Sequence, residues 1–214
     1  MNKTLTCFIL MIASCSICIA ENDDVAFWSW TSFNFHINES WKVNIREDFR
    51  FPDGSFAEYQ NQLLLNYTQL PDYLDLGIGY RLIEKEDSHG DFRQENRPFI
   101  DLALKKEVLG LKLSDRSRLE YRGMENKDDA FRYRNQLKLS SSHDLFNLPL
   151  RPYIADEIFV QEREGFYRNW VRTGIIWDVN KRLDIHFFTI FQSEKQRGRW
   201  DDLVIGGIEM AFTF

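Results

Sequence analysis

The sequence predicts an all-β protein, a single antiparallel transmembrane β-barrel, and three observations carry this prediction. The chain closes with an alternating stretch, residues 204–214, in which Phe214, Phe212, Met210 and Ile208 share one face. Similar alternating stretches recur along the chain at a length of about ten to thirteen residues, which suits a tilted membrane crossing better than a typical globular strand. A short apolar segment near the first residue is typical of an export signal.

Residues 1–20 are interpreted as a signal peptide. Lys3 supplies positive charge, residues 5–19 are almost wholly apolar, and Ala20 ends a small-residue cleavage site before Glu21. The apolar run is too short and too close to the start of the chain for a membrane-spanning helix. A lipobox-like sequence ending at Cys15 is the alternative. Cleavage after Ala20 is favoured because the apolar run continues past Cys15.

Cleavage would leave one domain, residues 21–214, without cysteine. All three cysteines lie in the removed segment, so the mature chain would hold no disulfide, thiol nucleophile or cysteine metal site. The formal net charge of −6 argues against a nucleic-acid partner. No later stretch approaches about twenty apolar residues, so a chain of this kind could enter a membrane only as a closed barrel.

Turn signals divide the rest of the chain into eleven candidate strands. The first five are 25–37 before Asn-Glu-Ser, 41–51 before Pro-Asp-Gly-Ser, 58–70 before Pro-Asp, 73–84 before a charged run, and 97–107 before Val-Leu-Gly. The remaining six are 111–122 before a polar loop, 130–141 before a Ser-rich connection, 150–161 before Glu-Arg-Glu-Gly, 166–178 before Val-Asn-Lys-Arg, 183–192 before a second charged run, and the closing 204–214. Alternation is poor in 150–161, and its faces cannot be assigned.

The connections predict an orientation and raise a problem of parity. Short connections alternate with longer, charged ones, which indicates short periplasmic turns and longer external loops. Bacterial barrels normally have an even number of strands, and eleven is odd. We therefore expect ten or twelve strands, with twelve favoured, within a range of about 10–12.

Charged residues crowd onto one face of most strands, and bulky apolar residues occupy the other. A soluble lipocalin-like barrel would have an apolar interior, so we expect the apolar faces toward lipid and the charges in the lumen. Two acids, Glu47 and Asp115, fall on the apolar faces and suggest β-bulges, a register error or sites near the membrane interface. The lumen or binding candidates are Arg46, Arg50, Arg116, Arg118, Glu120, Arg122, Arg132, Arg134, Arg168 and Arg172.

Several short motifs resemble those of a known family. They are Arg118-Leu119-Glu120-Tyr121-Arg122, Arg132-Tyr133-Arg134, Pro152-Tyr153, Asp156-Glu157-Ile158-Phe159 and Arg172-Thr173-Gly174. Together they resemble the family catalogued as domain of unknown function 2490, bacterial proteins regarded as outer-membrane β-barrels. The resemblance covers essentially the whole mature chain. It implies the fold and the location, and it brings no assigned activity.

The inward arginines have two interpretations. They form either a salt-bridged plug that fills the lumen or a polar, cation-lined passage for a small solute or anion. The sequence therefore predicts a non-enzymatic barrel with a structural role or passive small-solute passage. An outer-membrane lipid-modifying hydrolase is the alternative: His36 and His186 lie on strands, and Ser193 follows His186 closely enough to share a rim. A soluble periplasmic ligand-binding barrel is the third possibility.

The expected location is the bacterial outer membrane, and the expected partners follow from it. They are outer-membrane lipid, lipopolysaccharide and the barrel-assembly machinery, for which Phe212 and Phe214 at the chain end form the predicted recognition signal. The acidic residues of the loops match no calcium-loop pattern, and no nucleotide motif occurs, so the sequence predicts no metal and no cofactor.

Overall fold

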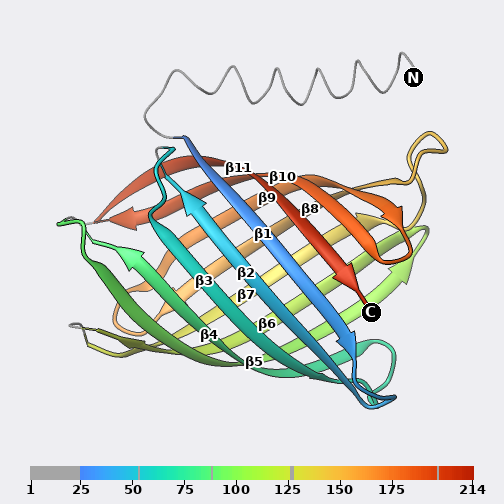
Figure 1. Cartoon of the computed structure of the whole chain (residues 1–214), viewed down its shortest axis with the longest axis horizontal. Coiled ribbons are helices and arrows are strands. Elements are labelled where there is room, and N and C mark those ends of the chain that lie inside the picture. The colour runs from blue at the N-terminus through green and yellow to red at the C-terminus, as the bar shows by residue number, and fades with distance from the viewer. Residues whose placement is uncertain (1–24, 53, 88, 126–127, 197) are drawn as a thin grey trace.

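The computed structural model describes residues 25–52, 54–87, 89–125, 128–196 and 198–214, which form one closed β-barrel (Figure 1). The predicted signal peptide, with its alternatives at Ala20 and Cys15, lies outside the described residues. The strands are β1 (Val25–His36), β2 (Trp41–Phe51), β3 (Glu58–Tyr67), β4 (Leu74–Glu86), β5 (Phe92–Val108), β6 (Leu111–Met124), β7 (Ala130–Ser141), β8 (Leu150–Gln161), β9 (Gly165–Asn180), β10 (Leu183–Gln196) and β11 (Arg199–Thr213).

The barrel has eleven strands in sequence order, so the eleven candidate strands are confirmed and the expected even number is wrong. Each strand is antiparallel to the next along the chain, but β1 and β11 pair in parallel, from Val25↔Val204 to Asn34↔Thr213. The parallel pair follows from the count. In an up-and-down barrel with an odd number of strands, the first and the last run in the same direction, as the blue and red arrows in Figure 1 show.

The connections are short at both ends, so the expectation of longer external loops is wrong. The end that carries Phe214, the C-terminal mouth, has connections 37–40, 68–73, 109–110, 142–149 and 181–182. The end where Val25 begins β1, the N-terminal mouth, has connections 52–57, 87–91, 125–129, 162–164 and 197–198. The charged runs at the N-terminal mouth continue the sheet: Lys85 pairs with Arg93, and Lys195 pairs with Trp200. Backbone pairing satisfies the peptide groups there, whatever the side chains are.

The outer face of the barrel is apolar, as the alternation predicts. Ile78 is 62% exposed and Phe131 is 52% exposed. Glu47 also lies on this face, in regular register between Thr31 and Asn61, and the carboxylate of Asp115 accepts a hydrogen bond of 2.5 Å from the amide of Asn135. No register shift occurs beside either acid, so they are not at bulges. In the part of the chain described, no helix is apolar and long enough to cross a bilayer.

The inner face is divided into two walls of different chemistry. The strands β2–β7 carry most of the inward arginines and acids. The inward side chains of β1 and β8–β11 form a buried, mainly aromatic cluster, in which the rings of Trp30 and Phe188 stack at a centroid distance of 4.4 Å. Its other members include Trp28, Tyr153, Phe159, Tyr167, Trp170, Ile176, Ile190 and Ile205. The same strands also direct Glu157, Arg168, Arg172 and Glu194 into the lumen, so charged side chains are present on both walls.

Candidate functional site

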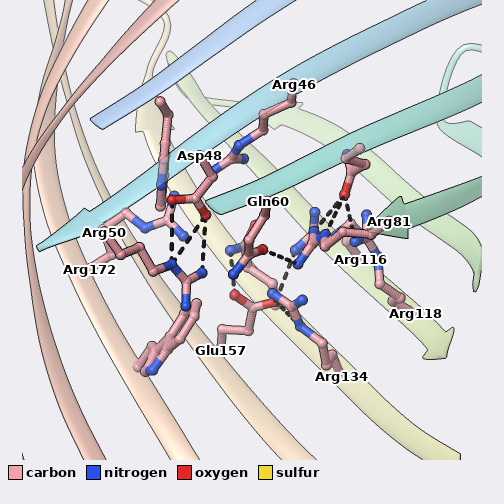
Figure 2. Close-up of a pocket in the computed structure, with 14 residues that line it drawn as sticks. Arg46, Asp48, Arg50, Gln60, Arg81, Arg116, Arg118, Arg134, Glu157 and Arg172 are labelled. Carbon is pink, nitrogen blue, oxygen red and sulfur yellow. Dashed lines mark hydrogen bonds and ion pairs between the residues drawn. The ribbon is translucent and has the colours of Figure 1, made fainter. Parts of the chain in front are cut away.

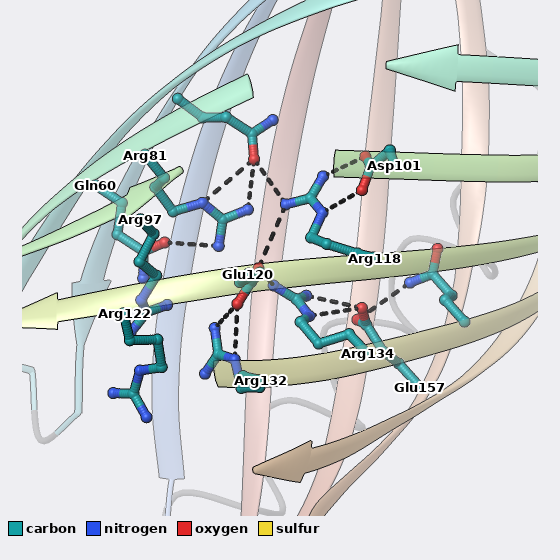
Figure 3. A network of polar contacts seen from close by, with 12 residues as sticks. Gln60, Arg81, Arg97, Asp101, Arg118, Glu120, Arg122, Arg132, Arg134 and Glu157 are labelled. Carbon is teal, nitrogen blue, oxygen red and sulfur yellow. Dashed lines mark hydrogen bonds and ion pairs between the residues drawn. The ribbon is translucent and has the colours of Figure 1, made fainter. Parts of the chain in front are cut away.

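The carboxylate of Glu120 lies at the centre of the polar wall, which is the inner face of the strands β2–β7. The register of β6 and β7 places Glu120 opposite Arg132 and Arg118 opposite Arg134, with all four side chains directed inward (Figure 3). Glu120 accepts hydrogen bonds from Arg132 Nε at 2.7 Å and from Arg134 Nη1 at 3.1 Å. Arg118 Nη1 lies 3.7 Å from the same carboxylate, whose side chain is 1% exposed. Three guanidinium groups thus share one buried acid.

Two further acids extend this network across the barrel. Asp101 of β5 receives two hydrogen bonds from Arg118, at 2.5 and 2.6 Å. Glu157 of β8 receives hydrogen bonds from Arg134 at 2.7 and 3.0 Å (Figure 3). It also receives one from Arg116 at 2.9 Å. The Arg118–Asp101 pair is bidentate, with one hydrogen bond to each carboxylate oxygen, and such a pair fixes the position of both partners.

A wide chamber of about 1170 Å³ lies toward the N-terminal mouth, as its lining shows: it includes residues of connections 52–57 and 87–91. Its cations are largely paired with acids. Arg122 donates to Glu95 at 2.6 and 3.0 Å, Arg50 lies 2.9 Å from Glu58, and Arg168 pairs with Glu194. These pairs match the interpretation of the lumen arginines as structural filling.

A smaller cavity of about 110 Å³ lies deeper in the lumen and is strongly cationic (Figure 2). Its lining contains seven arginines and two acids, Asp48 and Glu157, a formal excess of five positive charges. The remaining lining residues are neutral: Trp30, Gln60, Gln62, Gln136 and Trp170. Because Arg50, Arg81 and Arg134 line both this central cavity and the chamber, the two spaces adjoin.

Three arginines of the central cavity have no carboxylate within ion-pair distance among the described residues. Arg46 and Arg172 instead lie against the Trp30 ring, with Cζ 3.8 and 4.7 Å from its centroid. Arg81 donates to the side-chain oxygens of Gln60 and Gln62, at 3.3 and 3.2 Å for Nη1 and Nε. The lining of the central cavity therefore has a larger excess of cations over acids than that of the chamber, although Glu209 and Asp48 still attract Arg46.

All ten sequence-predicted lumen candidates lie inside the barrel. Arg46, Arg116, Arg118 and Arg172 line the central cavity, Arg122, Arg132 and Arg168 line the chamber, Arg50 and Arg134 line both, and Glu120 lies in the network between β6 and β7. The candidate set missed Arg81 and Glu157. The alternation of β4 places Arg81 on its polar face, so that signal was available. The weak alternation of β8 concealed Glu157.

The sequence-based hydrolase alternative depended on His186 and Ser193, and the structure separates them. His186 lies inside, with Nδ1 3.3 Å from Glu209 Oε2. Ser193, an odd number of residues along β10, faces outward and donates to Asp202 at 2.6 Å. The hydroxyl of Ser32 donates a hydrogen bond of 2.9 Å to the same Glu209.

His36, the other strand histidine, lies at the C-terminal mouth with Nδ1 3.3 Å from the Phe214 carbonyl oxygen. Within the described ranges, no cluster of three metal-ligating side chains is present.

The predicted recognition residues at the chain end form part of the β1–β11 junction. The rings of Phe212 and Phe214 stack on those of Phe33 and Phe35, at centroid distances of 5.4 and 5.1 Å. The backbone N–H of Phe214 donates to the Asn34 carbonyl at 2.9 Å. The last residues thus help to hold the two edge strands together.

Comparison with solved structures finds the same barrel fold in outer-membrane proteins. The chain is similar to the NanC porin, with a TM-score of 0.53 and 12% identity over 81% of this chain and 85% of that one. Weaker matches are the outer-membrane OmpT of Vibrio cholerae (TM-score 0.46, 10% identity, 79% of this chain and 59% of that one) and an anion-selective porin from Comamonas acidovorans (TM-score 0.43, 12% identity, 84% and 54%).

No curated protein sequence matches this chain. Residues 25–203 match the family described as protein of unknown function DUF2490, the family that the sequence motifs resemble. This match spans nearly the whole barrel, from the first residue of β1 into β11. The chain therefore belongs to the DUF2490 family.

Proposed function

We propose that this protein is an outer-membrane barrel through whose lumen small anionic solutes pass. The observation that carries the proposal is the central cavity, where seven arginines face two acids. A constriction lined by cations in a low-dielectric wall attracts anions and repels cations. The apolar outer face supports the membrane location, because the outward side chains of membrane barrels face lipid. Closure of the barrel supports it too, because a closed barrel lets strands pair all their backbone groups in lipid. The likeness to a protein named a porin is in keeping with passage.

The balance of paired and unpaired arginines supports passage over simple filling. In a plug, each buried cation is expected to have an acid, since an uncompensated buried charge is costly. Most arginines of the chamber meet that expectation. Arg46, Arg81 and Arg172 do not, and they gather where the lumen is narrow.

Conductance measurements in planar bilayers test this function. We expect the folded protein to carry current that favours chloride over potassium in a KCl gradient. Arg46→Gln combined with Arg172→Gln should lower the chloride-to-potassium permeability ratio by at least about fivefold. The reason is that the interaction between one such charge and an ion about 4 Å away in water is worth about 1 kcal/mol.

Arg163→Gln is the matched control, because Arg163 pairs with Asp128 in exposed connections at the N-terminal mouth. Its permeability ratio should equal that of the unaltered protein. Absence of current would remove the passage proposal and leave the salt-bridged plug, and a preference for potassium would show that the passage does not favour anions.

We also propose that the chain end is read by the barrel-assembly machinery. Deletion of Phe214 removes the stack on Phe35 and shortens the β1–β11 junction, so we expect a severalfold drop in the heat-modifiable, membrane-inserted form. The measurement is gel mobility with and without boiling after membrane fractionation. Phe214→Tyr keeps the aromatic end and should assemble normally. Unchanged assembly of the deletion would count against this role.

A further inference from the structure

We propose that the central cavity is a binding site for a small multivalent oxyanion of the size and charge of phosphate, and not only a charged stretch of the passage. This inference rests on the proposed function, since it names the class of anion that the same cavity holds. It is carried by observations independent of the charge count, namely unpaired hydrogen-bond donors around the cavity and the placement of two guanidinium groups on one indole ring.

Three buried N–H groups at this cavity have no acceptor among the described residues. They are Nε1 of Trp30 and Nε of Arg116 and Arg172, and all three residues line the central cavity. Trp30 is only 2% exposed. Buried donors in folded proteins are nearly always paired. Arg168 Nε and Ser142 Oγ also have no partner among the described residues and do not line this cavity, but the other three such atoms all belong to residues of this one cavity, where an acceptor would serve them.

The guanidinium groups of Arg46 and Arg172 lie around the same Trp30 ring, with Cζ 3.8 and 4.7 Å from its centroid. Phe188 stacks on that ring at 4.4 Å and Trp28 lies 6.1 Å from it, so the indole is held in place. The Trp30 indole and the guanidinium groups of Arg46 and Arg172 are therefore held in fixed positions beside one another, and such preorganisation favours anion binding.

The acids near the cavity are already engaged. Glu209, opposite Trp30 in the β1–β11 register, attracts Arg46 but also accepts a hydrogen bond from Ser32 at 2.9 Å and lies 3.3 Å from His186 Nδ1. Asp48 is engaged by Arg50 at 3.0 Å, and Glu157 is engaged by Arg116 and Arg134. Since both acids are already paired, the cavity presents donors to whatever enters it. The side-chain oxygen of Gln62 likewise accepts hydrogen bonds, from Arg81 and from Arg118 at 3.1 Å.

The chemistry of the donors selects an oxyanion. A phosphate-like group presents several acceptor oxygens in fixed directions, so it can meet guanidinium groups and an indole N–H at the same time. A chloride ion can also accept several hydrogen bonds, but all of its donors must converge on a single atom, whereas the oxygens of phosphate reach donors that are set apart. A cavity of about 110 Å³ has room for such an anion together with water.

Isothermal titration calorimetry on the full chain, folded in detergent, tests the site. The probes are inorganic phosphate and sulfate, with chloride as the monoatomic comparison at matched ionic strength. We expect saturable binding of phosphate or sulfate and none of chloride in the same concentration range. Trp30→Phe keeps a ring against Phe188 but removes the N–H, and Arg172→Gln removes one cation, so each should weaken binding by about tenfold.

Two variants of exposed residues serve as controls. Trp200→Phe changes an exposed indole far from the cavity, and Arg163→Gln changes an exposed arginine, so both should bind like the unaltered protein. If Arg172→Gln does not fold, as judged by gel mobility with and without boiling, Trp30→Phe and Arg172→Lys decide the matter. Arg172→Lys is expected to bind more weakly than the unaltered protein because lysine lacks the planar fork.

The two proposals fail separately. Equal affinity for phosphate and chloride, or a Trp30→Phe protein that binds phosphate as tightly as the unaltered chain, overturns the oxyanion site even if the barrel conducts anions. Selective phosphate binding by a barrel that carries no current leaves the site in place and removes the passage function.

Discussion

Replacement of Glu120 by Gln is expected to destabilise the barrel by about 3–5 kcal/mol, because one carboxylate serves three buried guanidinium groups. Arg132, Arg134 and Arg118 all lie within 3.7 Å of Glu120, and its side chain is 1% exposed. The glutamine amide keeps the shape but removes the charge, so it leaves cations uncompensated and places an N–H₂ group among donors. Urea-induced unfolding of the detergent-folded protein measures the loss.

Glu107→Gln is the matched control for this prediction. Glu107 is exposed near the end of β5, so the same chemical change should alter the free energy of unfolding by no more than about 0.5 kcal/mol. Equal stability of the Glu120→Gln and unaltered proteins would show that the arginines of the polar wall do not depend on this acid.

Gly207→Ala is expected to impair closure of the barrel, with a loss of about 2–3 kcal/mol in stability. Gly207 lies inward on β11, where a Cβ would meet the Phe188 ring and would lie 2.8 Å from the backbone oxygen of Trp28. The Phe188 ring cannot withdraw easily because it stacks on Trp30. The backbone of β1 cannot withdraw without breaking its pairing to β11. The yield of the heat-modifiable form and its urea midpoint are the measurements.

The neighbouring glycine supplies a control one residue away. Gly206 points outward, and a Cβ there meets nothing within 4 Å, so Gly206→Ala should assemble normally. If both variants behave alike, the close approach of Phe188 to β11 is not a constraint on closure.

Much of this architecture could be predicted because alternation records which side chains face the lumen. The inward positions of Arg118, Glu120, Arg132 and Arg134 follow from period-two spacing alone. The inward and outward faces of β8 could not be told apart in the sequence, because both carry apolar residues. Its inward Phe159 belongs to the buried, mainly aromatic cluster, and its outward Ile154 is 48% exposed. When both faces are apolar, alternation carries no contrast.

Other features depend on partners that a single strand does not reveal. Charged residues such as Lys85 and Arg93 resemble a loop, yet their backbones pair across the β4–β5 hairpin. Whether an arginine has a carboxylate partner depends on distant strands: Arg134 of β7 reaches Glu157 of β8, whereas Arg46 of β2 rests on Trp30 of β1. The cationic character of the central cavity therefore emerges only from the assembled barrel.

The parallel junction of β1 and β11 makes the two rims of the barrel distinguishable by the strand end that each one carries. Val25 lies at one rim and Phe214 at the other, whereas an up-and-down barrel with an even number of strands returns its first and last strand ends to the same rim. In a sealed vesicle, an impermeant label or a protease supplied from outside would therefore reach one end of the polypeptide and not the other. Terminal tags can thus report which way round each molecule is inserted.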